Sequence, residues 1–168
     1  MVTKILFNNI FILVLYIMNN TNNQRLNSQG FGITNGVTTI IALLAGFKAA
    51  NISNKAIISA LISLLLTDPI SDSYSLYISI KDNDEEQAYD IFLKTFLTQV
   101  IIQGIFLAIV IMSNNINQSF YISCVFGLLL VLYDFSARLK QPRVIIIELI
   151  KMLSLIVLTF SINNYFSN

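Results

Sequence analysis

The sequence is short of several residue types on which most enzyme sites depend. It contains no histidine, one cysteine (Cys124) and two prolines. The missing histidine excludes a hydrolase that uses an imidazole base, and a single cysteine excludes an intrachain disulfide. A Gly-x-Ser-x-Gly elbow, a phosphate-cradling glycine loop and the Gly-x-Gly-Asp motif of intramembrane aspartyl proteases are also absent. We therefore expect no enzyme activity.

Charged residues are equally scarce. They make up 11% of the 168 residues, whereas about 25% is usual in soluble domains. The formal net charge of +1 and the lack of a basic patch with interleaved aromatics predict no nucleic-acid partner. Hydrophobic residues account for 55% of the chain, and the mean hydropathy is +0.72. This composition predicts an integral membrane protein whose main partner is the lipid bilayer.

Long apolar runs dominate what is present. A spanning helix needs about 20 predominantly apolar residues, and strands would show strict alternation, which is missing here. Five segments qualify or nearly qualify: 31–50, 56–80, 91–112, 120–135 and 144–162. The fourth is short, so flanking residues would have to extend the helix for it to span the membrane. The sequence thus predicts an all-α, polytopic membrane protein with a five-helix transmembrane domain over residues 30–168.

The N-terminal region 1–29 is expected to be separate from that domain. Lys4 followed by the apolar residues 5–18 is similar to the start of a signal peptide, but an asparagine-rich linker, 19–27, follows in place of a small-residue cleavage site. We expect an uncleaved helix that lies at the interface or crosses the membrane marginally. A signal anchor is the alternative.

Lysine and arginine in the short loops predict the orientation. One side of the membrane would hold five of them and the other side two: Arg25, Lys81, Arg138, Lys140 and Arg143 against Lys48 and Lys55. We therefore expect the N-terminal side of the first helix and the loop 81–90 to be cytoplasmic, and the C-terminus to be non-cytoplasmic.

Two aspartates lie inside the second apolar segment. Asp68 and Asp72 are four residues apart, which places both carboxylates on one helix face. A charge at membrane depth costs at least about 2.5 kcal/mol, so such groups usually face a cavity, a partner or an ion path. Pro69 leaves the carbonyl of Leu65 without its usual donor, and the three oxygen groups together would suit a cation. The alternative is that both aspartates lie at a helix end, with Asp68 as a turn residue.

Polar or small residues at helical spacing run along three of the predicted helices. The first carries Gly32, Asn35, Thr39, Ala42, Gly46 and Ala49, the second Asp68, Asp72, Ser75 and Ser79, and the third Thr95, Gln99 and Gln103. Three polar faces predict a polar interior, in which the amide oxygen of Asn35 would face the cation. The small-residue stripe of the first helix also permits close helix packing and association with a second copy.

The available ligands predict the class of metal. Without histidine, and with only Met112 and Met152 well inside predicted helices, the donors are carboxylate, amide and hydroxyl oxygens. Such hard ligands suit Mn²⁺, Mg²⁺, Ca²⁺ or Fe²⁺ better than Cu⁺ or Zn²⁺. We expect a transported cation and no tightly bound cofactor.

Two further groups of charged residues allow both a structural and a functional interpretation. Glu148 and Lys151 are three residues apart and can pair inside the last segment, or they can relay protons. The acidic loop residues Asp84, Glu85 and Glu86 can collect cations, or they can form a solvated turn.

The first two helices resemble the vacuolar iron transporter family. Residues 32–39 read GITNGVTT, followed by an alanine-containing stretch that ends at Gly46, and residues 70–79 read ISDSYSLYIS. In that family the first helix begins with Asp-Gly-Leu-Thr, and the second ends in a pattern close to Ile-Ser-Met-Gly-x-Gly-x-Tyr-Leu-Ala. The resemblance implies a homodimer with a path between the protomers and proton-coupled transport of Fe²⁺ or Mn²⁺.

The departures from the family pattern bear on function. Asn35 is found where the family has its pathway aspartate, and Asp72 where it has a metal-binding methionine. The family's cytoplasmic metal-binding insert shrinks here to residues 81–87. The chain would thus be a short, divergent member. The alternative is a non-transporting relative kept for membrane assembly or partner binding.

Overall fold

The computed structural model describes residues 23–113 and 115–138, with side chains from 30 to 136, and isolated positions between 146 and 165. The two continuous ranges hold four α-helices: α2 (Asn23–Ala49), α3 (Asn54–Lys81), α4 (Glu85–Ser113) and α5 (Ile116–Arg138). Each is long and apolar enough to cross a membrane. The all-helical membrane architecture is therefore as predicted.

The predicted count of five spans plus an N-terminal helix is not matched by these four helices. Residues 5–18 lie outside the described residues, and the segment 144–162 is described only at isolated positions. The four helices that are described extend beyond the predicted apolar segments, because hydropathy marks only the part of a helix that lies in lipid. Thus α2 is already helical at Asn23, before the predicted segment starts at Phe31, and α5 begins at Ile116 instead of Phe120.

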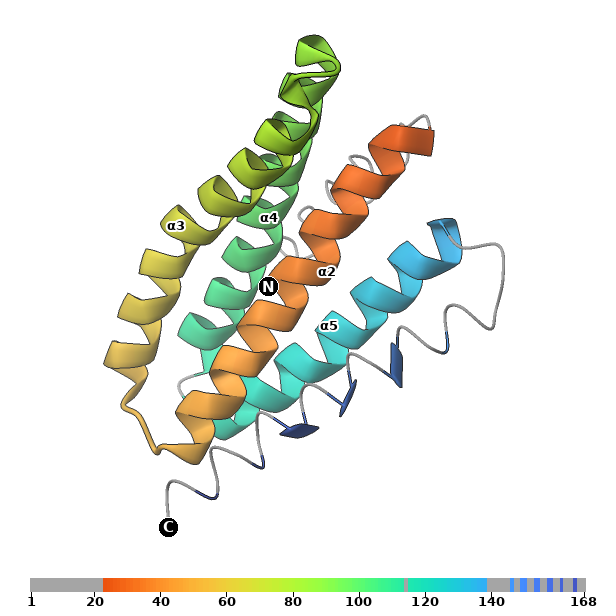
Figure 1. The fold of residues 1–168 in the computed structure, drawn as a ribbon. Helices are drawn as coiled ribbons and strands as arrows, with labels where there is room; N and C mark the ends of the chain where they lie inside the picture. The colour runs from red at the N-terminus through yellow and green to blue at the C-terminus, as the bar shows by residue number, and fades with distance from the viewer. Residues whose placement is uncertain are drawn as a thin grey trace, which may run out of the picture.

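Tight turns join successive helices, so neighbours run antiparallel (Figure 1). At the end of α2, Asn51 adopts a left-handed φ of 54°, which asparagine tolerates well. The N–H of Ile52 donates to the carbonyl of Phe47 at 3.1 Å, and that of Asn51 to Lys48 at 3.3 Å. This Schellman arrangement satisfies carbonyls that the helix end would otherwise leave unpaired.

The helix α4 is the centre of the arrangement. It packs against α3 on one side and α2 on the other, while α5 packs mainly against α2 (Figure 1). A Cβ added at Gly32 would lie 3.1 Å from the backbone oxygen of Thr95 and 3.2 Å from Cβ of Thr98. The glycine therefore permits the close approach of α2 to α4, which means that part of the predicted small-residue stripe packs within the chain itself.

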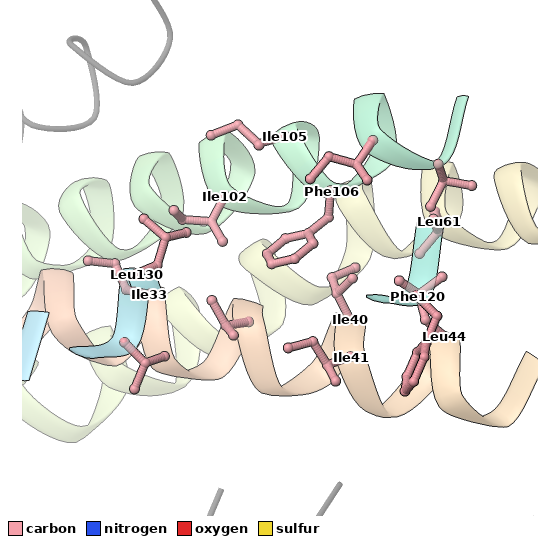
Figure 2. Close-up of a cluster of buried hydrophobic side chains, with 14 of the residues drawn as sticks. Ile33, Ile40, Ile41, Leu44, Leu61, Ile102, Ile105, Phe106, Phe120 and Leu130 are labelled. Atoms are coloured by element: carbon pink, nitrogen blue, oxygen red, sulfur yellow. The ribbon is translucent and has the colours of Figure 1, made fainter. Parts of the chain in front are cut away.

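A buried apolar cluster is formed by residues of all four helices (Figure 2). The ring of Phe106, fully buried in α4, meets the ring of Phe126 edge-on at 5.7 Å between centroids. Side chains from α2, α3 and α5 complete the cluster, among them Ile40, Ile41, Leu44, Leu61 and Leu130. The opposite face of α3 carries large exposed apolar residues at four-residue spacing: Ile62, Leu66, Ile70, Tyr74 and Ile78. Such a row is typical of a surface in contact with lipid.

Candidate functional site

The helix α3 carries its two carboxylates near the middle of its length. It runs without a break through Pro69, so the interpretation of Asp68 as a turn residue at a helix end is wrong. At 1.5 Å per residue, α3 is about 42 Å long and Asp68 lies about 20 Å from either end. Asp72 lies about 14 Å from the Lys81 end. Since the hydrocarbon core of a bilayer is about 30 Å thick, both aspartates are at membrane depth.

Aromatic residues mark both ends of the bundle and support this depth. Near the turn between α3 and α4, the ammonium group of Lys81 lies 5.7 Å from the ring centroid of Tyr77. At the opposite end, that of Lys48 lies 4.7 Å from the ring centroid of Phe120 and 4.2 Å from that of Tyr121. Aromatic and basic side chains gather in this way at membrane–water interfaces. The two aspartates lie between these two belts.

Amide side chains of α4 and α2 hold the carboxylates. Gln103 donates from Nε2 to Oδ2 of Asp68 at 2.6 Å, and Gln99 donates from Nε2 to Oδ2 of Asp72 at 2.6 Å. Asn35 donates from Nδ2 to the same Oδ2 of Asp72. The pairing follows from the antiparallel packing, because four residues back along α3 corresponds to four residues forward along α4. The structure thus brings polar side chains of the three helices together at Asn35, Asp68, Asp72, Gln99 and Gln103.

The role expected for Asn35 differs in one respect. Its amide nitrogen, not its oxygen, meets Asp72. An ionised carboxylate can only accept hydrogen bonds, so an amide that approaches it directly must present its N–H group.

Two polar atoms at this site have no hydrogen-bond partner. Gln99 and Gln103 are 0% and 1% exposed, and the Oε1 atom of each is buried and unpaired. Leaving such an acceptor unsatisfied costs about 1–3 kcal/mol, and native proteins rarely tolerate it without a reason. The sequence placed both glutamines on a polar face, but only the packing of α3 on α4 identifies the unpaired oxygens.

The remaining residues predicted for the path divide into two groups. Thr39 is half-buried on α2, one turn beyond Asn35. Ser75 and Ser79 are exposed, and their hydroxyls donate to Ser71 and Leu76 of their own helix at 2.8 and 2.7 Å. The reason is that the contact face of α3 follows a four-residue row that includes Ile57, Leu61, Pro69 and Ser73. This row rotates away from the side of the helix on which Ser75 and Ser79 lie.

The acidic loop before α4 has a structural role. Oδ1 of Asp84 accepts a hydrogen bond from the backbone N–H of Gln87 at 2.9 Å, so Asp84 caps the helix. Glu85 and Glu86 occupy the first turn of α4, where negative charge is favourable. This geometry favours the interpretation of the loop as a solvated, helix-capping turn.

The predicted proton-relay pair, Glu148 and Lys151, lies outside the described residues. Within the residues that the structure describes, no three His, Cys, Asp or Glu side chains gather at one point. The acidic component of the candidate site is therefore the pair Asp68 and Asp72, supplemented by neutral amides.

Comparison of the chain with protein-family models, curated proteins and solved structures gives no match. The resemblance to the vacuolar iron transporter family stays a prediction, and function has to be argued from the side chains themselves.

Proposed function

We propose that this protein transports a hard divalent cation, Mn²⁺ or Fe²⁺, across a membrane, with Asp68 and Asp72 as the ligands that carry charge. The observation that supports this most is the position of two carboxylates at membrane depth, turned toward polar groups of α2 and α4. Two carboxylates together balance one dication, and a charge retained at this depth usually marks an ion path. The resemblance of residues 32–46 and 70–79 to a metal transporter family points the same way.

Proton coupling is part of the proposal. When a dication leaves, two carboxylates at membrane depth are left without their counter-charge, and a proton on either would lower the cost. Proton binding and metal binding would then compete for the same oxygens. In the orientation predicted from lysine and arginine, the turn between α3 and α4 is cytoplasmic, and Asp72 is the carboxylate nearer to that side.

A homodimer would complete the site. Asp68 and Asp72 are only partly buried, and α2 contacts α3 little, so the side of the bundle between these two helices is open. Lipid is a poor neighbour for a carboxylate, whereas a second copy would cover it. The small residues Ala42, Gly46 and Ala49 on α2 would permit close approach of that copy.

A second function is favoured by the same hydrogen bonds. Three amides that hold two carboxylates also form a cross-helix network that could serve only to fix the packing of α2, α3 and α4. A non-transporting membrane protein for assembly or partner binding would need no more than this.

Metal uptake by proteoliposomes that contain the purified full-length chain separates the two functions. Uptake of Mn²⁺ and Fe²⁺ is measured with and without a pH gradient, and liposomes without protein are the control. Transport predicts uptake that depends on protein and changes with the gradient. The assembly function predicts no difference from protein-free liposomes.

A further inference from the structure

The structure brings two glutamine amides against the two carboxylates in the same way, one helical turn apart. In each pair the amide nitrogen donates to the carboxylate at 2.6 Å, while the amide oxygen is buried without a donor. Gln99 and Gln103 are 0% and 1% exposed, so bulk water does not reach either oxygen. An acceptor that is buried, unpaired and next to a carboxylate indicates a position suited to a cation or another donor.

We propose that Gln99 and Gln103 are ligands of the transported cation and that each amide rotates when the cation binds. In the structure the N–H group of each amide donates to the carboxylate. With a cation between Asp68 and Asp72, the carboxylates give their lone pairs to the metal, and the N–H group would face a positive charge. Rotation of the amide removes this repulsion and presents the oxygen as a ligand. This inference rests on the proposed function, because it concerns the same cation.

The rotation needs little space and no backbone movement. The terminal torsion of glutamine has a broad, roughly two-fold preference, and nitrogen and oxygen exchange positions with almost no change of shape. The other amide contact at the site, from Asn35, already serves Asp72 from α2. The helix α4 therefore supplies two matched side chains that can act as donor or ligand.

The proposal determines which ions the site prefers. Two carboxylate oxygens and two amide oxygens form a neutralising, all-oxygen set for a dication, which suits Mn²⁺, Mg²⁺ or Ca²⁺. The nearby hydroxyl of Ser73 donates to the carbonyls of Pro69 and Ile70 of its own helix. The selectivity for hard ions would thus depend on the two glutamines, which are the positions where a soft ligand of the same length can be introduced.

The test replaces each glutamine by methionine, which has similar length but a thioether at the end. Binding of Mn²⁺ and Cd²⁺ to the purified full-length protein is measured by isothermal titration calorimetry. If the side-chain ends contact the cation, Gln99→Met and Gln103→Met should each shift the ratio of Cd²⁺ to Mn²⁺ affinity toward Cd²⁺ by about tenfold or more, because sulfur is a soft ligand. Gln87→Met, on the first turn of the same helix, is the matched control and should leave the ratio unchanged.

The outcomes distinguish this inference from the proposed function. If the unmodified protein binds Mn²⁺ and the ratio is the same in both variants, the glutamines are structural and the inference is wrong while the transport proposal survives. If the unmodified protein binds no divalent cation, both are wrong. Gln103→Glu keeps the oxygen and the size but loses the N–H donor. It should bind Mn²⁺ more tightly than the unmodified protein above neutral pH, and it tests the same idea where a methionine variant does not fold.

Discussion

The substitution Asp72→Asn separates the electrostatic role of this residue from its structural role. Oδ2 of Asp72 accepts hydrogen bonds from Asn35 and Gln99. Asparagine has the same shape and keeps one oxygen that can accept both bonds, but it carries no charge. We expect Asp72→Asn to abolish Mn²⁺ uptake while the fold and its stability are preserved.

The expected effect on stability follows from two opposing terms. A hydrogen bond to a charged group contributes about 1.5–3 kcal/mol and a neutral one about 0.5–1.5 kcal/mol, so weakening two bonds costs about 2–3 kcal/mol in total. Removing a charge from a membrane helix gains at most about 2.5–3.5 kcal/mol, the value at the helix centre. The two terms nearly cancel, so the free energy of unfolding should change by about 1 kcal/mol or less.

Asp72→Leu is the matched contrast. It removes the same charge but also removes both acceptors, which leaves the amide nitrogens of Asn35 and Gln99 unpaired at membrane depth. Each unsatisfied donor costs about 1–3 kcal/mol, so Asp72→Leu should be less stable than Asp72→Asn by about 2 kcal/mol or more. Both variants should fail to take up Mn²⁺.

The assay uses the chain's single cysteine. Cys124 is half-buried in α5, and a maleimide dye that fluoresces on reaction with it reports thermal unfolding in detergent. Uptake of Mn²⁺ is measured in proteoliposomes with the same preparations. Undiminished uptake by Asp72→Asn would refute the role of Asp72 as a ligand. A melting temperature of Asp72→Asn as low as that of Asp72→Leu would refute the hydrogen-bond argument.

Three further predictions concern packing, charge and association. Gly32→Ala should lower the free energy of unfolding by about 1–3 kcal/mol, because the added Cβ would lie 3.1 Å from a backbone oxygen of α4. Gly104→Ala is the control, since its Cβ would have nothing within 4 Å, and equal melting temperatures of the two variants would contradict the prediction. Asn35→Asp adds a third carboxylate and should make Mn²⁺ affinity more steeply pH-dependent, so superimposable pH curves would remove Asn35 from the site. Gly46→Leu should weaken the proposed dimer, and crosslinking that captures only monomer from the unmodified chain would exclude that dimer.

The sequence predicted the fold class well, because long apolar segments and helical spacing of polar residues are both direct signals of membrane helices. Predicted segments such as 56–80 lie within the observed helices, since about 20 apolar residues leave few alternatives to a spanning helix. The ends were less predictable. Glu85 begins α4 outside the apolar run, where the cap from Asp84 and the helix dipole, rather than hydropathy, decide the boundary.

The site was predictable only in part. Helical spacing shows which residues share a face, but it does not show how the contact surface rotates around the helix along its length. Asp72 and Gln99 were both on predicted polar faces, and the packing of α3 on α4 brings them together. Ser75 has the right spacing relative to Asp72, yet it is exposed, because the contact row of α3 continues through Ser73 instead. The orientation of an amide also depends on its partner, so the nitrogen contact of Asn35 could not be read from its position in the chain.

The distribution of polarity along the helices bears on how a cation would move. On α4 the buried polar residues Thr95, Thr98, Gln99 and Gln103 alternate with the apolar Ile102 and follow Ala88 and Ile91, whereas from Ile105 onward the buried residues of α4 are all apolar. The carboxylates of α3 accept hydrogen bonds from Gln99 and Gln103, and the apolar residues that begin at Ile105 and Phe106 follow on α4, on the side away from the turn between α3 and α4. On the proposed function, a cation that leaves the carboxylates in the direction away from that turn meets a region in which the buried residues of α4 are apolar. On this proposal transport would require the helices packed around Phe106 to separate, and the amide contacts of Asn35, Gln99 and Gln103 are hydrogen bonds that join α2, α3 and α4 next to that region.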